Sequence, residues 1–147
     1  MGLFDSDANL RSAGALVEEA LAALGHDADV ARVEAGVEWK IAGTHAAVTI
    51  RLAQRDGKNV LRVRTPVLTP PKFAPGLHKD LLELNAGAVY GAAFALDGAE
   101  VIAVSERPTD DLDRSEVVEL IERVKACVDQ HAPGLAKRHG GKLPGAV

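Results

Sequence analysis

The amino-acid sequence predicts a single α+β domain in which helices pack against an antiparallel sheet. Three observations carry this prediction. Apolar residues recur at helical spacing within residues 7–25 and again after residue 113. Between residues 33 and 67 they alternate with polar residues, as in a strand with one buried face. Short glycine-containing turns separate the alternating stretches, and strands joined in this way pair antiparallel.

Length, composition and charge narrow the class of protein. A chain of 147 residues suits one domain, and a chain of this size buries roughly two-thirds of the surface that its unfolded form exposes. Hydrophobic residues make up 47% of the chain but aromatic residues only 3%, so alanine, valine and leucine must fill the core. The net charge of −4 argues against broad attraction to nucleic acid or to an anionic membrane, so we expect neither as a partner.

The sequence also indicates a cytoplasmic protein. Its single cysteine, Cys127, excludes an intramolecular disulfide and fits a reducing compartment. No stretch approaches the roughly 20 apolar residues that a membrane-spanning helix needs. The N-terminus lacks the basic and apolar regions of a signal peptide.

The first half of the chain predicts one helix and three strands. We expect the helix over 7–25, with Asp5 or Ser6 as its cap and Gly25 at its end. A strand with one polar face follows from Val33 to Ile41. Turns at Gly43-Thr44 and Asp56-Gly57 then introduce two further strands, whose apolar positions are Val48, Ile50 and Leu52, then Leu61, Val63 and Val67.

One pair of registers stacks these apolar side chains in rows. It places Ile41 opposite Ala46 and Gln54 opposite Asn59. The expected rows are Trp39–Val48–Thr65, Val37–Ile50–Val63 and Ala35–Leu52–Leu61. On the polar face Arg51 then lies beside Arg62, and Glu38 on the neighbouring strand can bridge these like charges.

The second half predicts a connector, a helix and an apolar hairpin. Prolines interrupt residues 66–75, and Pro75 suits the first turn of a helix whose buried stripe is Leu77, Leu81 and Leu84. Asn85 and Gly87 can adopt the left-handed conformation that ends it. The hairpin turns at Asp97-Gly98, which places Leu96 opposite Ala99.

Both faces of this hairpin are largely apolar, so it is either covered on both sides or contacts another chain. We therefore predict a partner or dimer interface at Tyr90, Gly91, Ala93, Ile102 and Val104.

The last helix carries the clearest signals. Asp113 and Glu116 can form a capping box, and the stripe Val117, Leu120, Ile121, Val124 and Val128 follows. We expect Pro133 to mark its end. The predicted domain therefore spans 1–135, and residues 136–147 form a flexible basic tail.

No residue pattern predicts an enzyme, a metal site or a cofactor. The five histidines lack the short paired spacings of a zinc site, and Cys127 borders the buried stripe of its helix, where it acts as a small apolar group. Four carboxylates between residues 110 and 116 depart from calcium-loop spacing and suit a helix start. We therefore predict no catalytic residues and no metal ligands.

The most site-like polar cluster is the basic sheet face formed by Arg51, Arg62 and Arg64. Two interpretations remain open for it. It is either a solvated face with internal salt bridges, or a surface for an anionic ligand or acidic peptide.

The predicted order α-β-β-β-α-β-β-α resembles that of the YbjN-type putative sensory transduction regulators and the CesT-like chaperones of type III secretion. The residues that carry the resemblance are Leu81–Asn85, the aromatic-bearing strand Tyr90–Leu96, the Asp97-Gly98 turn and the acidic helix start near Asp113. The resemblance implies a secretion chaperone-like fold, a polypeptide partner and a homodimer. We accordingly expect a non-enzymatic protein-binding module with a chaperone or regulatory role. The alternative is a small anionic-ligand-binding domain that uses the arginine-bearing face.

Overall fold

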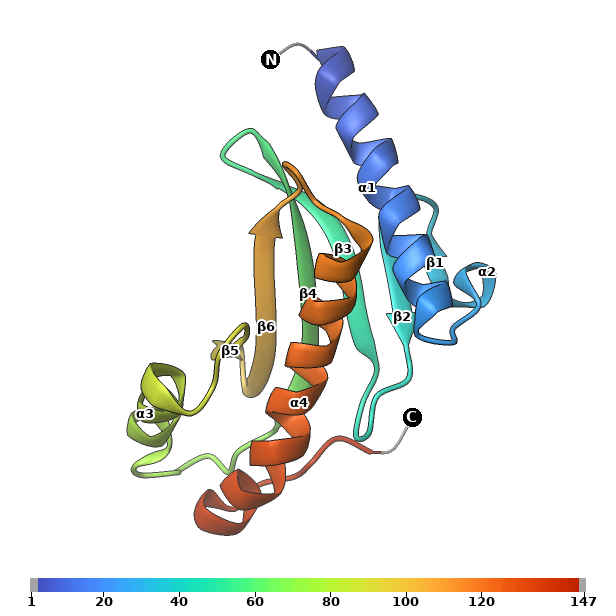
Figure 1. The fold of residues 1–147 in the computed structure, drawn as a ribbon. Coiled ribbons are helices and arrows are strands. Elements are labelled where there is room, and N and C mark those ends of the chain that lie inside the picture. The colour runs from blue at the N-terminus through green and yellow to red at the C-terminus, as the bar shows by residue number, and fades with distance from the viewer. Residues whose placement is uncertain (1–2, 146–147) are drawn as a thin grey trace.

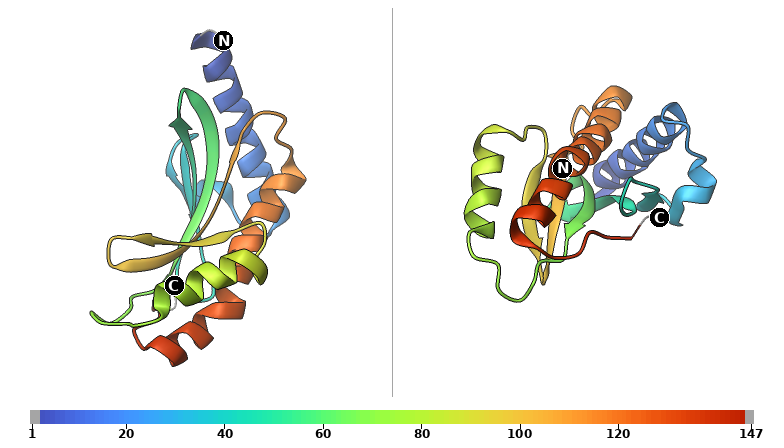
Figure 2. Two further views of the ribbon diagram at one scale, coloured as in Figure 1. Left: turned by 90° about the vertical axis from the view of Figure 1, so that its left-hand side faces the viewer. Right: turned by 90° about the horizontal axis from the view of Figure 1, so that it is seen from below.

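The computed structural model of the protein describes residues 3–145. Six antiparallel strands form one sheet in the order β1-β2-β3-β4-β6-β5, and two long helices lie on the same side of it (Figure 1; Figure 2). The third helix, α3, lies beside β5 at one edge. The elements are α1 (Leu3–Ala23), α2 (Ala28–Ala31), β1 (Arg32–Glu34), β2 (Glu38–Ile41), β3 (Val48–Arg55), β4 (Lys58–Leu68), α3 (Leu77–Gly87), β5 (Ala93–Asp97), β6 (Glu100–Pro108) and α4 (Arg114–His139). The predicted α+β class and the order of its main elements are confirmed.

The core lies between one face of the sheet and helices α1 and α4. At its centre Trp39, Ile50 and Val63 stand side by side on β2, β3 and β4, and each is fully buried. Val17 of α1 and Ile121 of α4 cover them and are also fully buried. The alternating pattern therefore directs one set of side chains inward and leaves the other set on a face that neither helix covers, which we call the open face.

The first predicted strand is two strands. Residues Ala35 to Val37 form a turn between β1 and β2, and Gly36 has a φ of +70°, a conformation that favours glycine. Strand β1 consequently runs antiparallel to β2 at the edge of the same sheet, with Arg32 opposite Trp39. Apolar and polar residues keep alternating through this turn. The sequence pattern therefore predicted one continuous strand in place of two. The short helix α2, capped by the Asp27 side chain, was also not predicted.

One predicted register is confirmed and another is wrong. Gln54 pairs with Asn59 across the tight Asp56-Gly57 turn, as expected. Ile41, however, pairs with Val48 and not with Ala46, because residues 42–47 form a loop rather than a two-residue turn. A Cβ atom at Gly43 would lie 2.4 Å from the carbonyl oxygen of Ala46, so the loop closes tightly on this glycine. The shift places Glu38 directly opposite Arg51.

The β5–β6 hairpin also differs from its predicted register. Asp97 pairs with Glu100 and Leu96 with Val101, so the turn consists of Gly98 and Ala99. Gly98 has a φ of +59°, which glycine adopts without strain. The expected pairing of Leu96 with Ala99 is therefore wrong by two residues.

Prolines interrupt the chain less than expected. Strand β4 runs through Pro66 to Leu68 with a register shift between them, which accommodates a residue that cannot donate a hydrogen bond. Helix α4 continues through Pro133 to His139, because Ala132 and Leu135 on either side are fully buried and hold the helix against the core. The predicted end of α4 at Pro133 is therefore wrong, and residues 136–139 of the predicted tail belong to this helix.

Of the predicted helix ends, the start of α4 is confirmed, whereas the starts of α1 and α3 and the end of α3 differ from their sequence signals. The predicted capping box is present: Glu116 N–H donates to Asp113 Oδ1 at 2.9 Å, and Asp113 N–H donates to Glu116 Oε2 at 3.0 Å. Helix α1 begins at Leu3, four residues earlier than expected, so Asp5 and Ser6 lie within its first turn. Helix α3 begins after Gly76, which leaves Pro75 outside it. Neither Asn85 nor Gly87 is left-handed.

A charged cluster ties α1 to the β1–β2 hairpin. Glu18 Oε2 accepts hydrogen bonds from Trp39 Nε1 at 2.9 Å and from Arg32 Nη2 at 2.5 Å and Nε at 3.1 Å. The Trp39 indole N–H and the Arg32 guanidinium lower the pKa of the Glu18 carboxyl from its ordinary value. The ionised form of Glu18 is therefore the form that stabilises the fold.

We expect Glu18→Gln to lower the free energy of unfolding at pH 7 by about 1–2 kcal/mol, because the charge-assisted hydrogen bonds are lost from a partly exposed site. Since the folded-state pKa of Glu18 is lowered, its contribution is fully present above the unfolded-state pKa near 4.5 and disappears as the pH falls through the folded-state value. Urea unfolding between pH 7 and pH 3 measures this. The wild type should lose more stability than Glu18→Gln over that range, and equal losses would contradict the assignment. Glu19→Gln, at an exposed position of the same helix, is the control.

Candidate functional site

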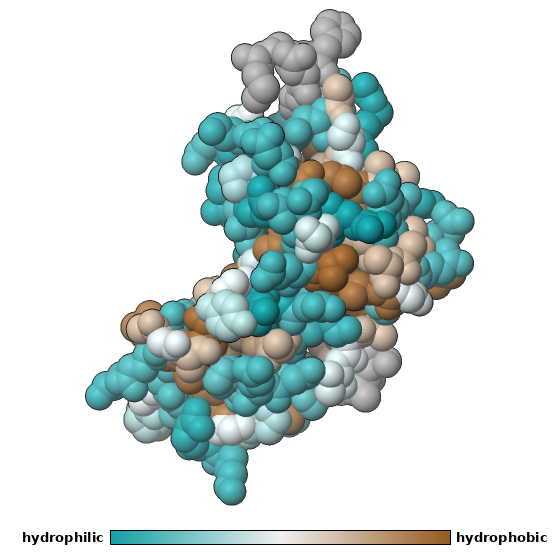
Figure 3. Space-filling model, viewed as in Figure 1, coloured by the Kyte–Doolittle hydropathy of each residue, from teal (hydrophilic) through white to brown (hydrophobic). Residues whose placement is uncertain are grey.

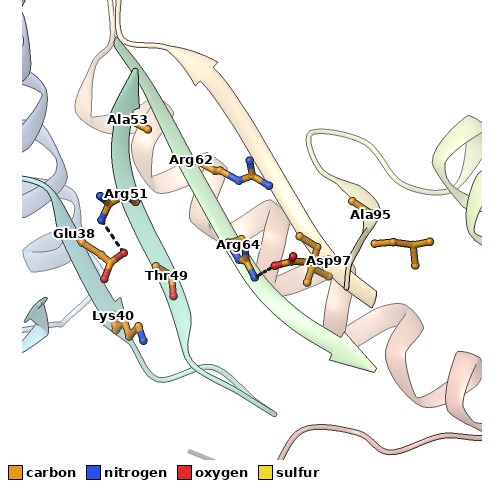
Figure 4. Close-up of a pocket in the computed structure, with 11 residues that line it drawn as sticks. Glu38, Lys40, Thr49, Arg51, Ala53, Arg62, Arg64, Ala95 and Asp97 are labelled. Atoms are coloured by element: carbon orange, nitrogen blue, oxygen red, sulfur yellow. Dashed lines mark hydrogen bonds and ion pairs between the residues drawn. The ribbon is translucent and has the colours of Figure 1, made fainter. Parts of the chain in front are cut away.

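The structure brings most residues of the two predicted sites onto one surface, the open face. Arg51 on β3 and Arg62 and Arg64 on β4 line a shallow hollow of about 670 Å³, together with Ala95 of β5 and Ile102 of β6 (Figure 4). Val104 pairs with both Arg64 and Ala93, so it extends the same surface. The predicted basic face and the predicted apolar interface are therefore neighbouring parts of one sheet face.

Tyr90 and Gly91 lie apart from this face, in the loop between α3 and β5. The Tyr90 ring is 67% exposed, and the Arg123 guanidinium of α4 stacks over it at 4.2 Å. Gly91 has a φ of +71°, and a Cβ atom there would lie 2.9 Å from Cγ of Arg123. These two residues therefore pack toward α4, and the structure does not join them to Ala93, Ile102 and Val104.

The apolar part of the open face is small. Ile102 is only 1% exposed, while Ala93, Ala95 and Val104 are half-buried. The β5–β6 hairpin is strongly twisted relative to the rest of the sheet, as the left view of Figure 2 shows. An ion pair between Arg64 and Asp97, 2.7 Å long, joins β4 to the end of β5 (Figure 4). The hairpin thus covers part of its own apolar surface.

Each arginine of the open face already has an acidic partner. Arg51 Nη1 lies 3.1 Å from Glu38 Oε1 and 3.4 Å from Glu34 Oε2, and Arg62 Nη1 lies 3.5 Å from Glu106 Oε2. The hydrogen bond that Arg51 donates to the Glu38 carboxylate raises the pKa of Arg51. Arg62 Nε is buried and makes no hydrogen bond to any of the described residues. Internal pairing accounts for most of the positive charge, and an anion would have to compete with these carboxylates.

The two edges of the sheet differ in how they are covered. At the β5 edge, the side chain of Asn85 binds the backbone of Phe94 twice: Phe94 N–H donates to Asn85 Oδ1 at 2.8 Å, and Asn85 Nδ2 donates to the Phe94 carbonyl at 3.0 Å. Asn85 therefore acts as a substitute for a neighbouring strand. At the β1 edge the described residues provide no comparable side-chain cap, and Val33 is 55% exposed.

A groove of about 520 Å³ runs beside the β1 edge, between α1 and the β1–β2 hairpin. Leu10, Gly14 and Ala15 form its α1 side, and Gly36 and the indole of Trp39 form the other. Gly14 is buried and lacks a side chain that would fill the space. The β1 edge and this groove were missed by the sequence analysis, although a glycine inside an alternating stretch, Gly36, is a known sign of a turn or close approach.

The described residues include neither a metal-binding cluster nor an activated cysteine. Among them no group of three or more His, Cys, Asp or Glu side chains could hold a metal ion. Burial raises the pKa of the Cys127 thiol to about 12, so this side chain is a protonated, inert core group at neutral pH. Within residues 3–145 no helix has the length and apolar character needed to cross a membrane.

Apolar side chains also reach the surface on the helix-covered side. Figure 3 shows this side as mostly polar, with apolar groups gathered along the seam between α1 and α4 and around α3. The exposed large hydrophobic residues are Val30, Val33, Phe73, Leu82, Tyr90 and Leu96. They are distributed over several elements, and none of them lines the groove between α1 and the β1–β2 hairpin.

Solved structures of type III secretion chaperones share this fold. One chain of the HopA1-SchA chaperone-effector complex is 18% identical, with a TM-score of 0.59 over 88% of this chain and 96% of that chain. One chain of the heterodimeric ExoU-SpcU complex of Pseudomonas aeruginosa is 15% identical, with a TM-score of 0.56 over 79% and 94%. The Yersinia pestis secretion chaperone SycH, in complex with a stable fragment of YscM2, gives 20% identity and a TM-score of 0.53 over 84% and 98%.

No curated protein matches the sequence. The family described as "T3SS (YopN, CesT) and YbjN peptide-binding chaperone 1" matches residues 11–145, which covers all of the sheet and α4. This is a family of chaperones and not of enzymes, as the sequence predicted. The chain belongs to this family of type III secretion and YbjN peptide-binding chaperones.

Proposed function

We propose that this protein holds an extended segment of another polypeptide along the free edge of β1, in a chaperone or regulatory role. The observation that carries this proposal is the difference between the sheet edges: Asn85 caps the β5 edge, whereas β1 is open and adjoins the apolar groove. An added strand gains backbone hydrogen bonds from such an edge, and pockets beside it accept alternate side chains. Three similar structures contain chaperones bound to polypeptide partners. The cytoplasmic location stays a prediction.

The groove supplies what an added strand needs besides backbone pairing. Its floor contains two glycines, Gly14 and Gly36, and the apolar faces of Leu10 and Trp39. Its charged border consists of Arg32 and Glu18, which are already paired with each other, and Arg11. The groove therefore favours an uncharged side chain, and recognition through the backbone permits partners of varied sequence.

We expect Val33→Asp to weaken binding of a polypeptide segment at least tenfold, because aspartate disfavours strand pairing and places a charge at the edge. The probe is a tryptophan-free peptide selected from a random-sequence phage library on the wild type. Trp39 is the only tryptophan in the chain and lies fully buried beneath the groove, so its fluorescence reports a peptide that changes the packing around it.

Phe73→Asp is the matched control, since it changes an 80% exposed apolar residue on the connector between β4 and α3. It should bind like the wild type. Equal affinity of Val33→Asp and wild type would contradict the proposal, and so would a selected peptide that binds without changing Trp39 emission.

We further propose that the protein forms a homodimer through the open face, which combines half-buried apolar side chains with alternating charges. Val104 and Ala95 lie next to the ion pair between Arg64 and Asp97 there. We expect Val104→Arg to be monomeric at concentrations at which the wild type is dimeric, because an added guanidinium next to Arg64 opposes burial. Light scattering measures this, with Thr44→Arg in an exposed loop as the control. A wild type that is monomeric at every concentration would remove the dimer but leave peptide binding intact.

The alternative function, binding of a small anionic ligand, rests on the open face as well. The hollow is lined by Lys40 and three arginines, and Arg62 Nε has no hydrogen-bond partner among the described residues. This alternative predicts that inorganic pyrophosphate binds the wild type in calorimetric titration and binds Arg62→Ala at least tenfold more weakly. Absence of binding to the wild type at millimolar pyrophosphate would exclude it.

A further inference from the structure

The last two residues of α4 and the three residues after them contact two segments, the start of the connector between β4 and α3 and the first turn of α3. We call residues 138–142 the clasp. At one end, Thr69 and Lys142 exchange two backbone hydrogen bonds, each 2.9 Å long. At the other, Asp80 Oδ2 lies 2.8 Å from His139 Nε2 and 2.9 Å from Arg138 Nε. In Figure 1 the chain beyond α4 runs below the lower end of the sheet.

Two glycines give the clasp its path. Gly140 and Gly141 have φ values of +74° and +102°, which other residues rarely adopt. A Cβ atom on Gly141 would lie 2.5 Å from the Thr69 carbonyl oxygen and 2.9 Å from the Pro70 Cα. Both are backbone atoms and cannot move aside as a flexible side chain can. The contact between Lys142 and Thr69 therefore depends on glycine at position 141.

The contacts of Arg138 and His139 with Asp80 stabilise the other end of the clasp. The hydrogen bonds from His139 and Arg138 lower the pKa of the Asp80 carboxyl, so this group is ionised at neutral pH. The His139 side chain is only 11% exposed, and Asp80 lies in the first turn of α3, where a negative charge suits the helix dipole. Arg138 and His139 thus hold the start of α3.

Helix α3 has few other anchors. Of its 11 residues only Leu77 and Leu81 are buried, and both lie in its first half. Its second half is held by Leu84, which is half-buried and packs against the core, and by Asn85, which binds the backbone of Phe94. The clasp at the start of the helix and Asn85 near its end are the polar contacts that add to these leucines.

Helix α3 covers the outer edge of β5, a strand whose own sequence does little to prevent pairing with another strand. β5 has the sequence Ala-Phe-Ala-Leu-Asp, and it contains no lysine or proline that would discourage pairing with another strand. Its only charged residue, Asp97, lies at the turn. Strands at the edge of a sheet are commonly protected by a helix that covers them, and here Asn85 of α3 supplies that cover.

We propose that the clasp holds α3 against β5. When the clasp opens, Asn85 separates from Phe94, and the outer backbone groups of β5 become available for hydrogen bonding. The fold then has one edge that is always open, β1, and a second that opens only when residues 138–142 leave Thr69 and Asp80. This gate is a property of the fold itself and does not require that β1 binds a peptide.

Amide hydrogen exchange of the full chain, followed by NMR, tests this gate, because the Phe94 amide donates directly to Asn85. In Gly141→Val we expect the Phe94 amide to exchange at least tenfold faster than in the wild type, approaching the rate in Asn85→Ala. Amides of β3 and of the middle of α1, which lie away from α3, should keep their wild-type rates.

Two further variants keep the test decisive. Asp80→Asn weakens the other end of the clasp without introducing a bulky group, and it should accelerate exchange at Phe94 in the same direction. Gly145→Val is the matched control, because a Cβ atom there meets nothing within 4 Å. Faster exchange at Thr69, which donates to Lys142, combined with an unchanged Phe94 amide would show that the clasp opens without moving α3, and would overturn the proposal. Uniform acceleration of all amides in both variants would overturn it as well.

Discussion

The structure depends on the burial of one sheet face against α1 and α4. The fully buried row Trp39, Ile50 and Val63 fixes which side chains point inward, and α1 and α4 supply the apolar cover for that side only. A one-residue slip in any of these strands would turn its apolar side chains toward water. The other face and the two edges of the sheet are therefore left for polar pairing, for other elements of the chain or for partners.

The open face and the two edges meet this constraint in different ways. Acidic side chains from outer strands neutralise the central arginines, as Glu38 does for Arg51 and Glu106 for Arg62, so the open face is stable in water without an anion. Asn85 caps the β5 edge, whereas no side chain of the described residues caps the β1 edge in this way. The arginines of the open face are already paired, so their charge alone does not indicate a binding site. The uncapped β1 edge is the feature on which our binding proposal rests.

Features encoded by neighbouring residues could be predicted from the sequence. The capping box of α4 and the β3–β4 register rest on residues a few positions apart, and both are confirmed. The predicted β2–β3 register was wrong because the loop at Gly43 is longer than a two-residue turn. The predicted β5–β6 register was wrong because the two-residue turn lies one position later than expected, at Gly98-Ala99. The acidic partners of Arg62 and Arg64, Glu106 and Asp97, come from strands more than 30 residues away, so local patterns could not identify them.

The contact of Asn85 with Phe94 shows how one side chain can occupy the backbone groups at the outer edge of a strand. Its position in α3 looked like a helix end, because asparagine often adopts the left-handed conformation there. In the fold it remains helical and uses its amide, which has both a donor and an acceptor, to pair with the two backbone groups of Phe94. An aspartate would offer only acceptors and a leucine neither. The same requirement for paired donors and acceptors is the basis of our proposal for β1, where no such cap is found among the described residues.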